Sequence, residues 1–224
     1  MFLIAIQEDL AKHTMRIKNS DQVLDSWWSD FNRVPTLRSN KIKNLILNNE
    51  GFNWGLLNLA FPEKSSLRLA NIIDNDISDD SDLWWNEERK EHLYEQMSES
   101  HKLDLHKMLQ GTSYSYGTVY RRMRKGRSMA ELRTDGFAGC LRTPKGGSSK
   151  QIVIRAGENK WSVRLLTPRE YARLQGVRES FKLPSNSNKG YFAMGDAVCV
   201  PVIEYIAENI LDKIYENYRK KTLK

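Results

Sequence analysis

The clearest hydrophobic pattern in the chain lies near its C-terminus. From Pro201 onward, apolar residues recur at intervals of three or four positions: Val202, Ile203, Ile206, Ala207, Ile210, Leu211, Ile214 and Tyr215. This spacing places them on one face of an α-helix. Arg219, Lys220 and Lys221 follow at the end where the helix dipole is negative and favours cations. The pattern predicts a long helix, opened by Pro201, that packs one side against other parts of a fold.

A shorter helix is predicted between residues 164 and 176, with signals at both of its ends. Thr167 can cap the N-terminus and Pro168 suits the first helical position, while Glu170 stands at the capping-box offset from Thr167. Gly176 supplies a left-handed stop after the last turn. These residues predict a capped helix in this stretch.

The chain begins with an uninterrupted apolar run, Phe2–Ile6, followed at once by acidic residues. A strand that is apolar on both faces is typical of the middle of a covered, mainly parallel sheet. The strand–helix–strand units that would complete such a sheet are not evident downstream. We therefore expect a strand whose sheet is formed elsewhere; the alternative is a sheet whose other strands the pattern does not reveal.

The stretch from Gly111 to Arg155 is strongly basic and holds two strand-like segments, 119–123 and 151–155. Turns are expected at Gly126 and at Gly146–Gly147. Its basic residues outnumber Glu131 and Asp135: Arg121, Arg122, Arg124, Lys125, Arg127, Arg133, Arg142, Lys145, Lys150 and Arg155. Cationic side chains on strands and Gly/Ser loops suit phosphate contacts, and arginine can read guanine. A merely solvated basic face is the alternative.

Composition narrows the class of protein. The 224 residues carry a formal charge of +7, which permits a polyanionic partner without requiring one. The two cysteines, Cys140 and Cys199, are far apart and suggest neither a disulfide framework nor a zinc site, and the histidines have no metal-ligand spacing. The apolar start is too short for a secretory signal and lacks its basic residues. We expect a cytoplasmic protein with no bound metal.

Two runs of the sequence together resemble the last two motifs of the DNA (cytosine-5) methyltransferases. That family uses a pattern close to R-x-L-T-x-x-E-x-x-R-L-x-G and then G-N-A/S-V-x-x-P-V. The first is matched by Arg164, Leu166, Thr167, Glu170, Arg173, Leu174 and Gly176. The second is matched by Gly195, Ala197, Val198, Pro201 and Val202, with Asp196 where the family usually has Asn. Two ordered motifs at this separation are a specific signal; an unrelated pair of capped helices is the alternative.

The resemblance implies a fold and a division of the chain. It predicts an incomplete α/β fragment of a Rossmann-like, S-adenosylmethionine-dependent methyltransferase, together with a mixed α+β target-recognition domain. Residues 1–11 would form the terminal strand of the catalytic domain and residues 12–163 the target-recognition domain. Residues 164–224 would carry the last two motifs and the helix that returns to the catalytic domain.

The resemblance also assigns residues to roles. Gly136–Gln151 is similar to the loop that precedes the penultimate motif in this family, although Cys140-Leu141 stands where a Thr-Leu pair commonly begins it. The implied structural residues of the penultimate motif are Arg164, Thr167, Glu170 and Arg173. The implied cofactor-binding residues, at one edge of the S-adenosylmethionine pocket, are Asp196, Ala197 and Val198. The expected DNA contacts are Arg121, Arg122, Arg124, Arg142, Thr143, Lys145, Gly146, Gly147, Ser148, Ser149, Lys150 and Gln151.

The residues that would perform methyl transfer are missing from these 224 positions. The family takes its thiolate nucleophile from a Pro-Cys dipeptide, whereas Cys140 follows Gly139 and Cys199 follows Val198. A Glu-Asn-Val run and a glycine-rich cofactor loop are absent as well. We therefore assign no catalytic residue and expect the chain to be inactive alone.

These observations predict one function and leave one alternative. The chain would recognise duplex DNA and help to form the S-adenosylmethionine pocket of a restriction-modification type cytosine-5 methyltransferase. A complementary chain would supply the glycine-rich loop, the Pro-Cys nucleophile and the Glu-Asn-Val motif. The alternative is a non-catalytic, sequence-specific DNA-binding module or a decayed methyltransferase remnant.

Overall fold

The computed structural model describes residues 2–5, 16–18, 40–49, 54–57, 62, 65–143 and 150–222. The chain divides into two compact units. One unit is Ser65–Pro201, and the other combines Met1–Lys64 with Val202–Lys224. Each is described by itself below.

A four-stranded antiparallel sheet is the centre of the Ser65–Pro201 unit. Its strands are β4 (Ser115–Arg124), β5 (Arg127–Arg133), β6 (Ile152–Gly157) and β7 (Lys160–Leu165), in the order β5-β4-β6-β7. Lys125 and Gly126 both have positive φ in the tight turn between β4 and β5, the conformation that matches the twist of a hairpin. The two predicted strands and the turn at Gly126 are confirmed, whereas the turn at Gly146–Gly147 lies outside the described residues.

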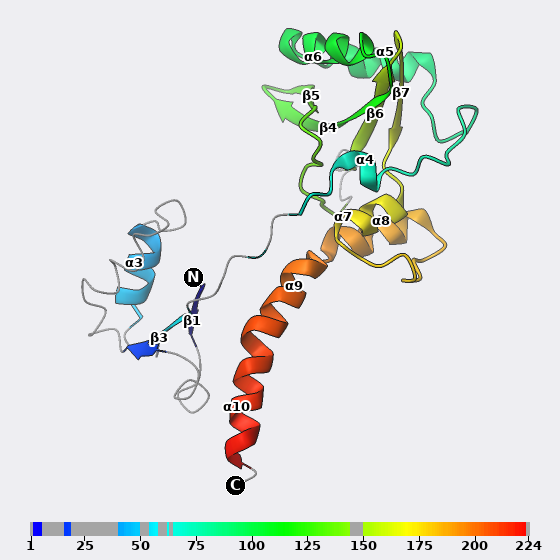
Figure 1. Ribbon diagram of the computed structural model, residues 1–224. Helices are drawn as coiled ribbons and strands as arrows, with labels where there is room; N and C mark the ends of the chain where they lie inside the picture. Colours follow the sequence, from blue (N-terminus) through cyan, green and yellow to red (C-terminus); the bar gives the residue numbers. More distant parts are fainter. Residues whose placement is uncertain are drawn as a thin grey trace. The chain divides into compact units, whose positions relative to one another are not determined.

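Two helices, α5 (Glu87–Glu95) and α6 (Glu99–Leu109), cover one face of this sheet (Figure 1). Their buried leucines, Leu93 and Leu105, share a hydrophobic core with Val119 of β4 and Ile152 and Ile154 of β6. Asn86 caps α5, because its side chain accepts a hydrogen bond from the backbone N–H of Arg89. We call this side of the sheet the helix-hairpin face.

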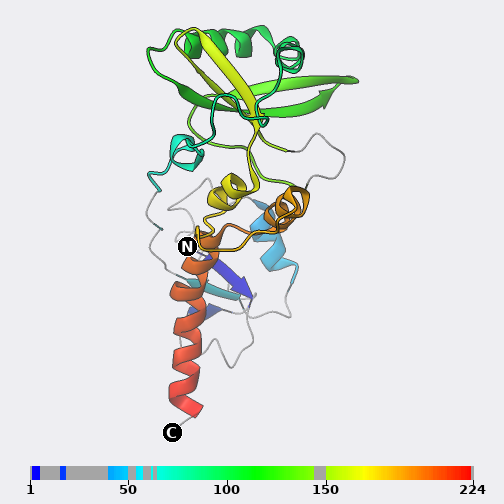
Figure 2. The same cartoon turned by 90° about the vertical axis from the view of Figure 1, so that its right-hand side faces the viewer.

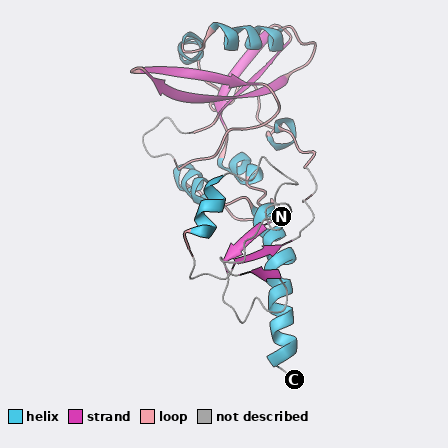
Figure 3. Cartoon of the chain, turned by 90° about the vertical axis from the view of Figure 1, so that its left-hand side faces the viewer, coloured by secondary structure: helices cyan, strands magenta, loops and turns pink. Residues whose placement is uncertain are grey.

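The opposite side of the sheet carries a second core, formed by α4 (Leu69–Ile72), α7 (Pro168–Leu174) and α8 (Ser187–Asp196) (Figure 2). The core contains Leu69 of α4, Val153 of β6, Tyr171 and Ala172 of α7 and Met194 of α8. We call this side the loop face. With the sheet covered on both sides, the unit has helices above and below its strands (Figure 3).

The second core extends the compact unit beyond residue 163, where the resemblance places the end of the recognition domain. We expected the recognition domain to end at residue 163, but the compact unit continues to Pro201. The reason is physical: α7 and α8 bury Leu166, Tyr171 and Tyr191 against the sheet that β7 completes. The penultimate motif is therefore part of the same compact unit as the four-stranded sheet.

The predicted capped helix is confirmed as α7. Thr167 accepts a hydrogen bond from the N–H of Glu170, and the Glu170 carboxylate accepts one from the N–H of Thr167, so the capping box is complete. Pro168 is the first helical residue, and Gly176 has a φ of 75°. A side chain at Gly176 would also collide with the Pro201 ring, since its Cβ would lie 2.4 Å from Pro201 Cδ.

The other unit contains β1 (Phe2–Ala5), β2 (Arg16–Lys18), β3 (Trp54–Leu57) and helix α3 (Asn40–Leu47). The predicted N-terminal strand is present. Our expectation that its sheet is formed elsewhere and is mainly parallel is wrong for the described strands. As in the alternative, β1 has a partner within the chain: β3 pairs antiparallel with both β1 and β2, in the order β1-β3-β2. Backbone pairing with β3 sets the direction of β1, which its apolar side chains alone do not specify.

The predicted C-terminal helix is built from α9 (Val200–Ile206), a π-helical segment (Ala207–Leu211) and α10 (Asp212–Thr222). The i→i+5 hydrogen bonds of the π-helical segment form a local bulge in the helix. This bulge rotates the row of apolar side chains about the helix axis. Ile210 and Ile214 are buried, whereas four other apolar members of the predicted face are 47–61% exposed: Val202, Ile203, Leu211 and Tyr215. The expectation of one packed side is thus met in part.

One stretch of the described chain, Ser187–Glu216, is long and apolar enough to be considered as a membrane span. Within its most apolar window 17% of the residues are buried, and Ala197–Cys199 interrupt the helix. A single stretch of this kind is weak evidence for a membrane protein.

Candidate nucleic-acid interface

Basic and aromatic side chains of the β4–β5 hairpin lie together on the loop face. Because side chains alternate along a strand, Tyr120, Arg122 and Arg124 share this face, and the register places Glu131 of β5 directly opposite Tyr120. Glu131 Oε1 lies 2.8 Å from Arg124 Nη2, and Glu131 Oε2 lies 3.5 Å from Arg122 Nε. One carboxylate thus orders two arginines, which leaves net positive charge on the surface.

The segment after β5 enters the loop face through contacts with the sheet. The Thr118 hydroxyl donates a hydrogen bond of 3.0 Å to the carbonyl of Phe137. Ala138 and Leu141 then pack against the second core. Leu141 is the second residue of the pair that begins the family's loop, and its apolar side chain fixes this end of the loop on the sheet.

The far end of the same loop is anchored by α7 and α8. The backbone N–H of Gln151 donates to the Tyr171 hydroxyl at 2.6 Å, and Lys150 Nζ donates to Asn188 Oδ1 at 2.9 Å. Gln151 Nε2 also donates to the carbonyl of Cys140 at 3.4 Å and so connects the two ends. The last residue of the loop is therefore bonded to the penultimate motif.

Gly195, the first residue of the last motif, packs against the loop backbone. A Cβ at this position would lie 2.6 Å from the carbonyl carbon of Arg142 and 2.6 Å from the amide nitrogen of Thr143. Real Cβ atoms do not approach backbone so closely, and backbone cannot swing aside as a flexible side chain can. Glycine is required here to allow the close approach.

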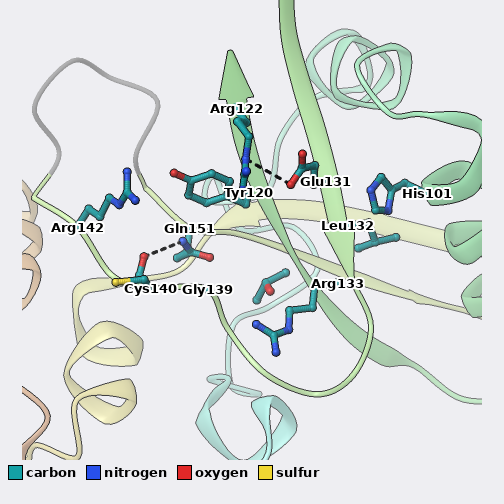
Figure 4. A pocket seen from close by; sticks show the side chains of 11 residues that line it. His101, Tyr120, Arg122, Glu131, Leu132, Arg133, Gly139, Cys140, Arg142 and Gln151 are labelled. Carbon is teal, nitrogen blue, oxygen red and sulfur yellow. Dashed lines mark hydrogen bonds and ion pairs between the residues drawn. The ribbon is translucent and has the colours of Figure 1, made fainter. Parts of the chain in front are cut away.

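A cavity of about 360 Å³ lies between the hairpin and the loop (Figure 4). Tyr120, Arg122 and Glu131 come from the strands, while Arg142 and Gln151 come from the two arms of the loop. Arg122 and Arg142 both lie near the Tyr120 ring, with their guanidinium carbons 5.3 Å and 5.9 Å from its centroid. The cavity thus combines an aromatic ring, cations and hydrogen-bond acceptors.

The predicted DNA contacts separate into three groups. Arg122 and Arg142 are exposed and line the cavity, Arg124 is exposed on the same strand as Arg122, and Thr143 and Lys150 are half-buried. Arg121 instead lies on the helix-hairpin face, where burial and the nearby charge of Arg89 lower the pKa of its guanidinium. Five predicted contacts lie outside the described residues: Lys145, Gly146, Gly147, Ser148 and Ser149.

Gln151 differs from the expectation in its exposure. The residue is 1% exposed, its amide nitrogen holds the loop together through Cys140, and its side chain lines the cavity instead of the outer surface. Tyr171 and Asn188, which the sequence analysis did not single out, anchor the loop. The hydroxyl of a buried tyrosine needs a hydrogen-bond partner, and this is the signal that could have identified Tyr171.

The structural residues of the penultimate motif form a buried network. Arg164 and Glu170, exposed by 1% and 0%, pair through two hydrogen bonds of 2.7 Å and 2.6 Å. Glu170 also accepts from the N–H groups of Thr167 and Asp74 at 2.6 Å and 2.8 Å. Arg173 donates to the carbonyl of Ile72 at 3.0 Å. The motif therefore ties α7 to the segment that follows α4.

Trp84 and Trp85, which are adjacent in the chain before α5, are half-buried packing residues. They line a second cavity of about 740 Å³ together with Tyr191. Arginines already lie over both rings, Arg89 at 3.8 Å from Trp85 and Arg155 at 4.6 Å from Trp84. These contacts hold the acidic segment before α5 against the sheet.

Two buried tyrosines are expected to make the Ser65–Pro201 unit less stable at alkaline pH. Tyr171 and Tyr191 pack edge to face, and burial raises the pKa of each to about 12 from 10.0. The unfolded chain loses these protons at a lower pH than the folded chain does. The stability that depends on the two protonated tyrosines is therefore fully present below pH 10 and is lost as the pH rises towards 12. We expect the free energy of unfolding to fall by about 1.4 kcal/mol per pH unit for each tyrosine in that window.

Urea unfolding at a series of pH values above and below 10 measures this slope. Tyr191→Phe is expected to reduce it by about half, since one of the two ionisations is removed. A slope that is the same in the variant would contradict the assignment to these tyrosines.

The expected cofactor edge lies at the end of α8. Asp196 is its last residue, and Ala197 closes it by donating its N–H to the carbonyl of Ala193 at 3.0 Å. Asp196 is exposed and Val198 is 61% exposed. An accessible carboxylate and an accessible apolar side chain fit one edge of a pocket for a ligand with hydroxyl and aromatic groups.

A sheet with a doubly anchored loop, joined to these two motifs, points to the cytosine-5 DNA methyltransferases. The family model for the C-5 cytosine-specific DNA methylases matches residues 1–212, and the chain belongs to this family.

Several curated relatives match a shorter stretch. The chain is 37% identical over 65 residues to the Type II methyltransferase M.HpaII of Haemophilus parainfluenzae, covering 29% of the chain and 18% of the relative. It is 42% identical over 62 residues to M.NlaX of Neisseria lactamica, covering 28% and 19%. It is 40% identical over 76 residues to M.DsaV of Dactylococcopsis salina, covering 34% and 21%. The matched stretches thus span about a fifth of these relatives.

Proposed function

We propose that this chain recognises duplex DNA and forms one edge of the S-adenosylmethionine pocket in a cytosine-5 methyltransferase of the Type II restriction-modification kind. In this proposal the thiolate nucleophile comes from a complementary chain. In this proposal the chain binds DNA in the cytoplasm.

One observation carries the proposal: the loop between β5 and β6 is held by the two motifs that mark the family. Its outgoing end is bonded to Tyr171, and its incoming end lies against the backbone of Gly195. Three arginines are exposed here: Arg142 belongs to the loop, and Arg122 and Arg124 lie on β4. A scaffold that fixes both ends of a basic loop can present it to phosphates and base edges in a defined register.

The division of labour follows from the residues that are present. S-adenosylmethionine supplies the methyl group when it is bound, and Asp196, Ala197 and Val198 would contact it. Neither cysteine follows a proline, so neither matches the family nucleophile. The exposed apolar side chains of Val202 and Ile203 on α9 supply contact area for a complementary chain.

The experiment that tests the function combines the purified chain with a polypeptide that carries the glycine-rich loop, Pro-Cys and Glu-Asn-Val, together with labelled S-adenosylmethionine and DNA. We expect methyl transfer to cytosine from the mixture and none from either component alone. Transfer by the 224-residue chain alone would overturn the assignment of the nucleophile to another molecule. DNA binding with no transfer by a folded mixture would favour the non-catalytic DNA-binding module.

Arg142 provides a sharper test of the recognition role. Replacing it with alanine is expected to weaken binding to the preferred duplex by about 1–3 kcal/mol, if the guanidinium reads a base. Fluorescence anisotropy on the preferred duplex and on random DNA measures the difference. Equal weakening on both would reassign Arg142 to a phosphate contact.

A further inference from the structure

The cavity on the loop face contains a hydrogen-bond acceptor that has no partner in the described part of the chain. Gln151 Oε1 is buried and unpaired, while the other end of the same amide donates to Cys140. Figure 4 shows the oxygen directed away from Cys140 and towards the region below Tyr120. A buried polar atom without a partner costs free energy, which a ligand that donates a hydrogen bond would recover.

The hydrogen bond to Cys140 sets the orientation of this amide. A half-turn would exchange its nitrogen and oxygen, and the oxygen would then face the carbonyl oxygen of Cys140. The bond to Cys140 then selects the orientation in which nitrogen faces the loop and oxygen faces the cavity. Gln151, which anchors the loop, therefore directs its acceptor oxygen towards the cavity.

Two further groups complete the hydrogen-bonding pattern of the cavity. The Glu131 carboxylate is a second acceptor on the same side as Tyr120. Arg142 is a donor, and no described carboxylate lies within ion-pair distance of it. The Tyr120 ring forms a flat apolar wall of the cavity. Arg142 lies over this ring, but its side chain is exposed and can move aside for a ligand.

These groups fit a planar ligand with N–H donors on one edge and acceptors on another. Guanine has this arrangement, since N1–H and the 2-amino group donate while O6 and N7 accept from the fork of an arginine. A base can also stack on a tyrosine ring. The volume of about 360 Å³ falls in the range of small-molecule sites, about 300–1,000 Å³.

Guanine can donate to Gln151 only when it is not base-paired with cytosine. In a duplex the N1–H and one amino hydrogen of guanine are donated to cytosine, so a paired guanine cannot use that edge for Gln151. We propose that the cavity between the β4–β5 hairpin and the recognition loop binds an unpaired guanine that has left the duplex stack. This inference rests on the proposed DNA-recognition function and names a base other than the cytosine to be methylated.

The test uses short duplexes with randomised flanks, one fully paired and the others carrying a single unpaired A, C, G or T. An unpaired base has already lost its pairing energy, so a protein that extracts it binds the bulged duplex more tightly. We expect the unpaired guanine to improve the dissociation constant at least about tenfold over the paired duplex and over the other three bulges. Fluorescence anisotropy with the full chain measures it.

Variants locate the effect in the cavity. Tyr120→Ala and Gln151→Leu are each expected to abolish the preference for unpaired guanine. Tyr116→Ala is the matched control, because Tyr116 lies on the same face of β4 but donates its hydroxyl hydrogen bond to Asn75, at 2.9 Å. Circular dichroism and thermal melting of each variant identify any loss that is caused by unfolding.

The outcomes are distinguishable. Equal affinity for all the duplexes overturns the cavity assignment and leaves the proposed function intact. Preference for another base overturns the choice of guanine, and a guanine preference that survives in both cavity variants overturns the location. Absence of binding to every duplex overturns both this inference and DNA recognition by the chain.

Discussion

Replacing Glu170 with alanine is expected to lower the free energy of unfolding by about 3–5 kcal/mol, because it leaves the buried Arg164 guanidinium without its counter-charge. The loss goes beyond the ion pair itself. The N–H groups of Thr167 and Asp74, which donate to the same carboxylate at 2.6 Å and 2.8 Å, lose their acceptor as well. Urea unfolding followed by tryptophan fluorescence measures the change.

Glu179→Ala is the matched control. Glu179 also pairs with an arginine, Arg173, at 2.7 Å, but its side chain is 63% exposed, and such pairs contribute at most about 1 kcal/mol. The double replacement of Arg164 by Met and Glu170 by Leu is expected to recover much of the loss, since an apolar pair leaves no buried charge. A Glu170 variant as stable as the Glu179 control would refute the central role of this pair.

Replacing Gly195 with alanine is expected to reduce the preference for the cognate duplex over random DNA about tenfold or more, while the sheet stays folded. The added methyl group meets backbone atoms of Arg142 and Thr143 at 2.6 Å, so the loop must move. Displacement of the loop separates Arg142 from the bases, whereas Arg122 and Arg124 on the rigid hairpin still bind phosphates. The duplex preferred by the wild-type chain, selected from a random library, serves as the probe.

Ala193→Ser adds an atom to the same helix at an exposed position and serves as the control. It is expected to leave the dissociation constants for both duplexes unchanged. If Gly195→Ala binds with wild-type preference, the loop does not depend on its contact with α8, and the argument for coupling between the last motif and recognition fails.

The parts of the fold that could be predicted from the sequence are those set by local chemistry. Thr167, Pro168 and Glu170 specify the start of α7 through bonds between residues three positions apart, and Gly126 specifies the β4–β5 turn. The strand and helix that they delimit were found. Contacts between distant residues, such as Gly195 with Arg142, leave no signal in one sequence.

The orientation of the strand side chains was harder to predict because both faces of the sheet are covered. Val119 is buried on the helix-hairpin face and Thr118 on the loop face, so alternation between apolar and polar residues does not reveal which side is accessible. Arg121 was grouped with Arg122 for this reason, and only the register with Ala130 separates them. The expected parallel pairing of β1 is wrong for a similar reason, because an apolar run does not specify its neighbours.

The double anchoring of the loop has a consequence for how specificity changes within the family. The described attachments use backbone atoms of Cys140, Arg142, Thr143 and Gln151, together with the side chains of Leu141, Lys150 and Gln151. Under the proposed function, we expect substitutions between Thr143 and Lys150 to change the DNA target while these attachments keep the two ends of the loop in place. A new target would then require a new loop sequence and not a new fold.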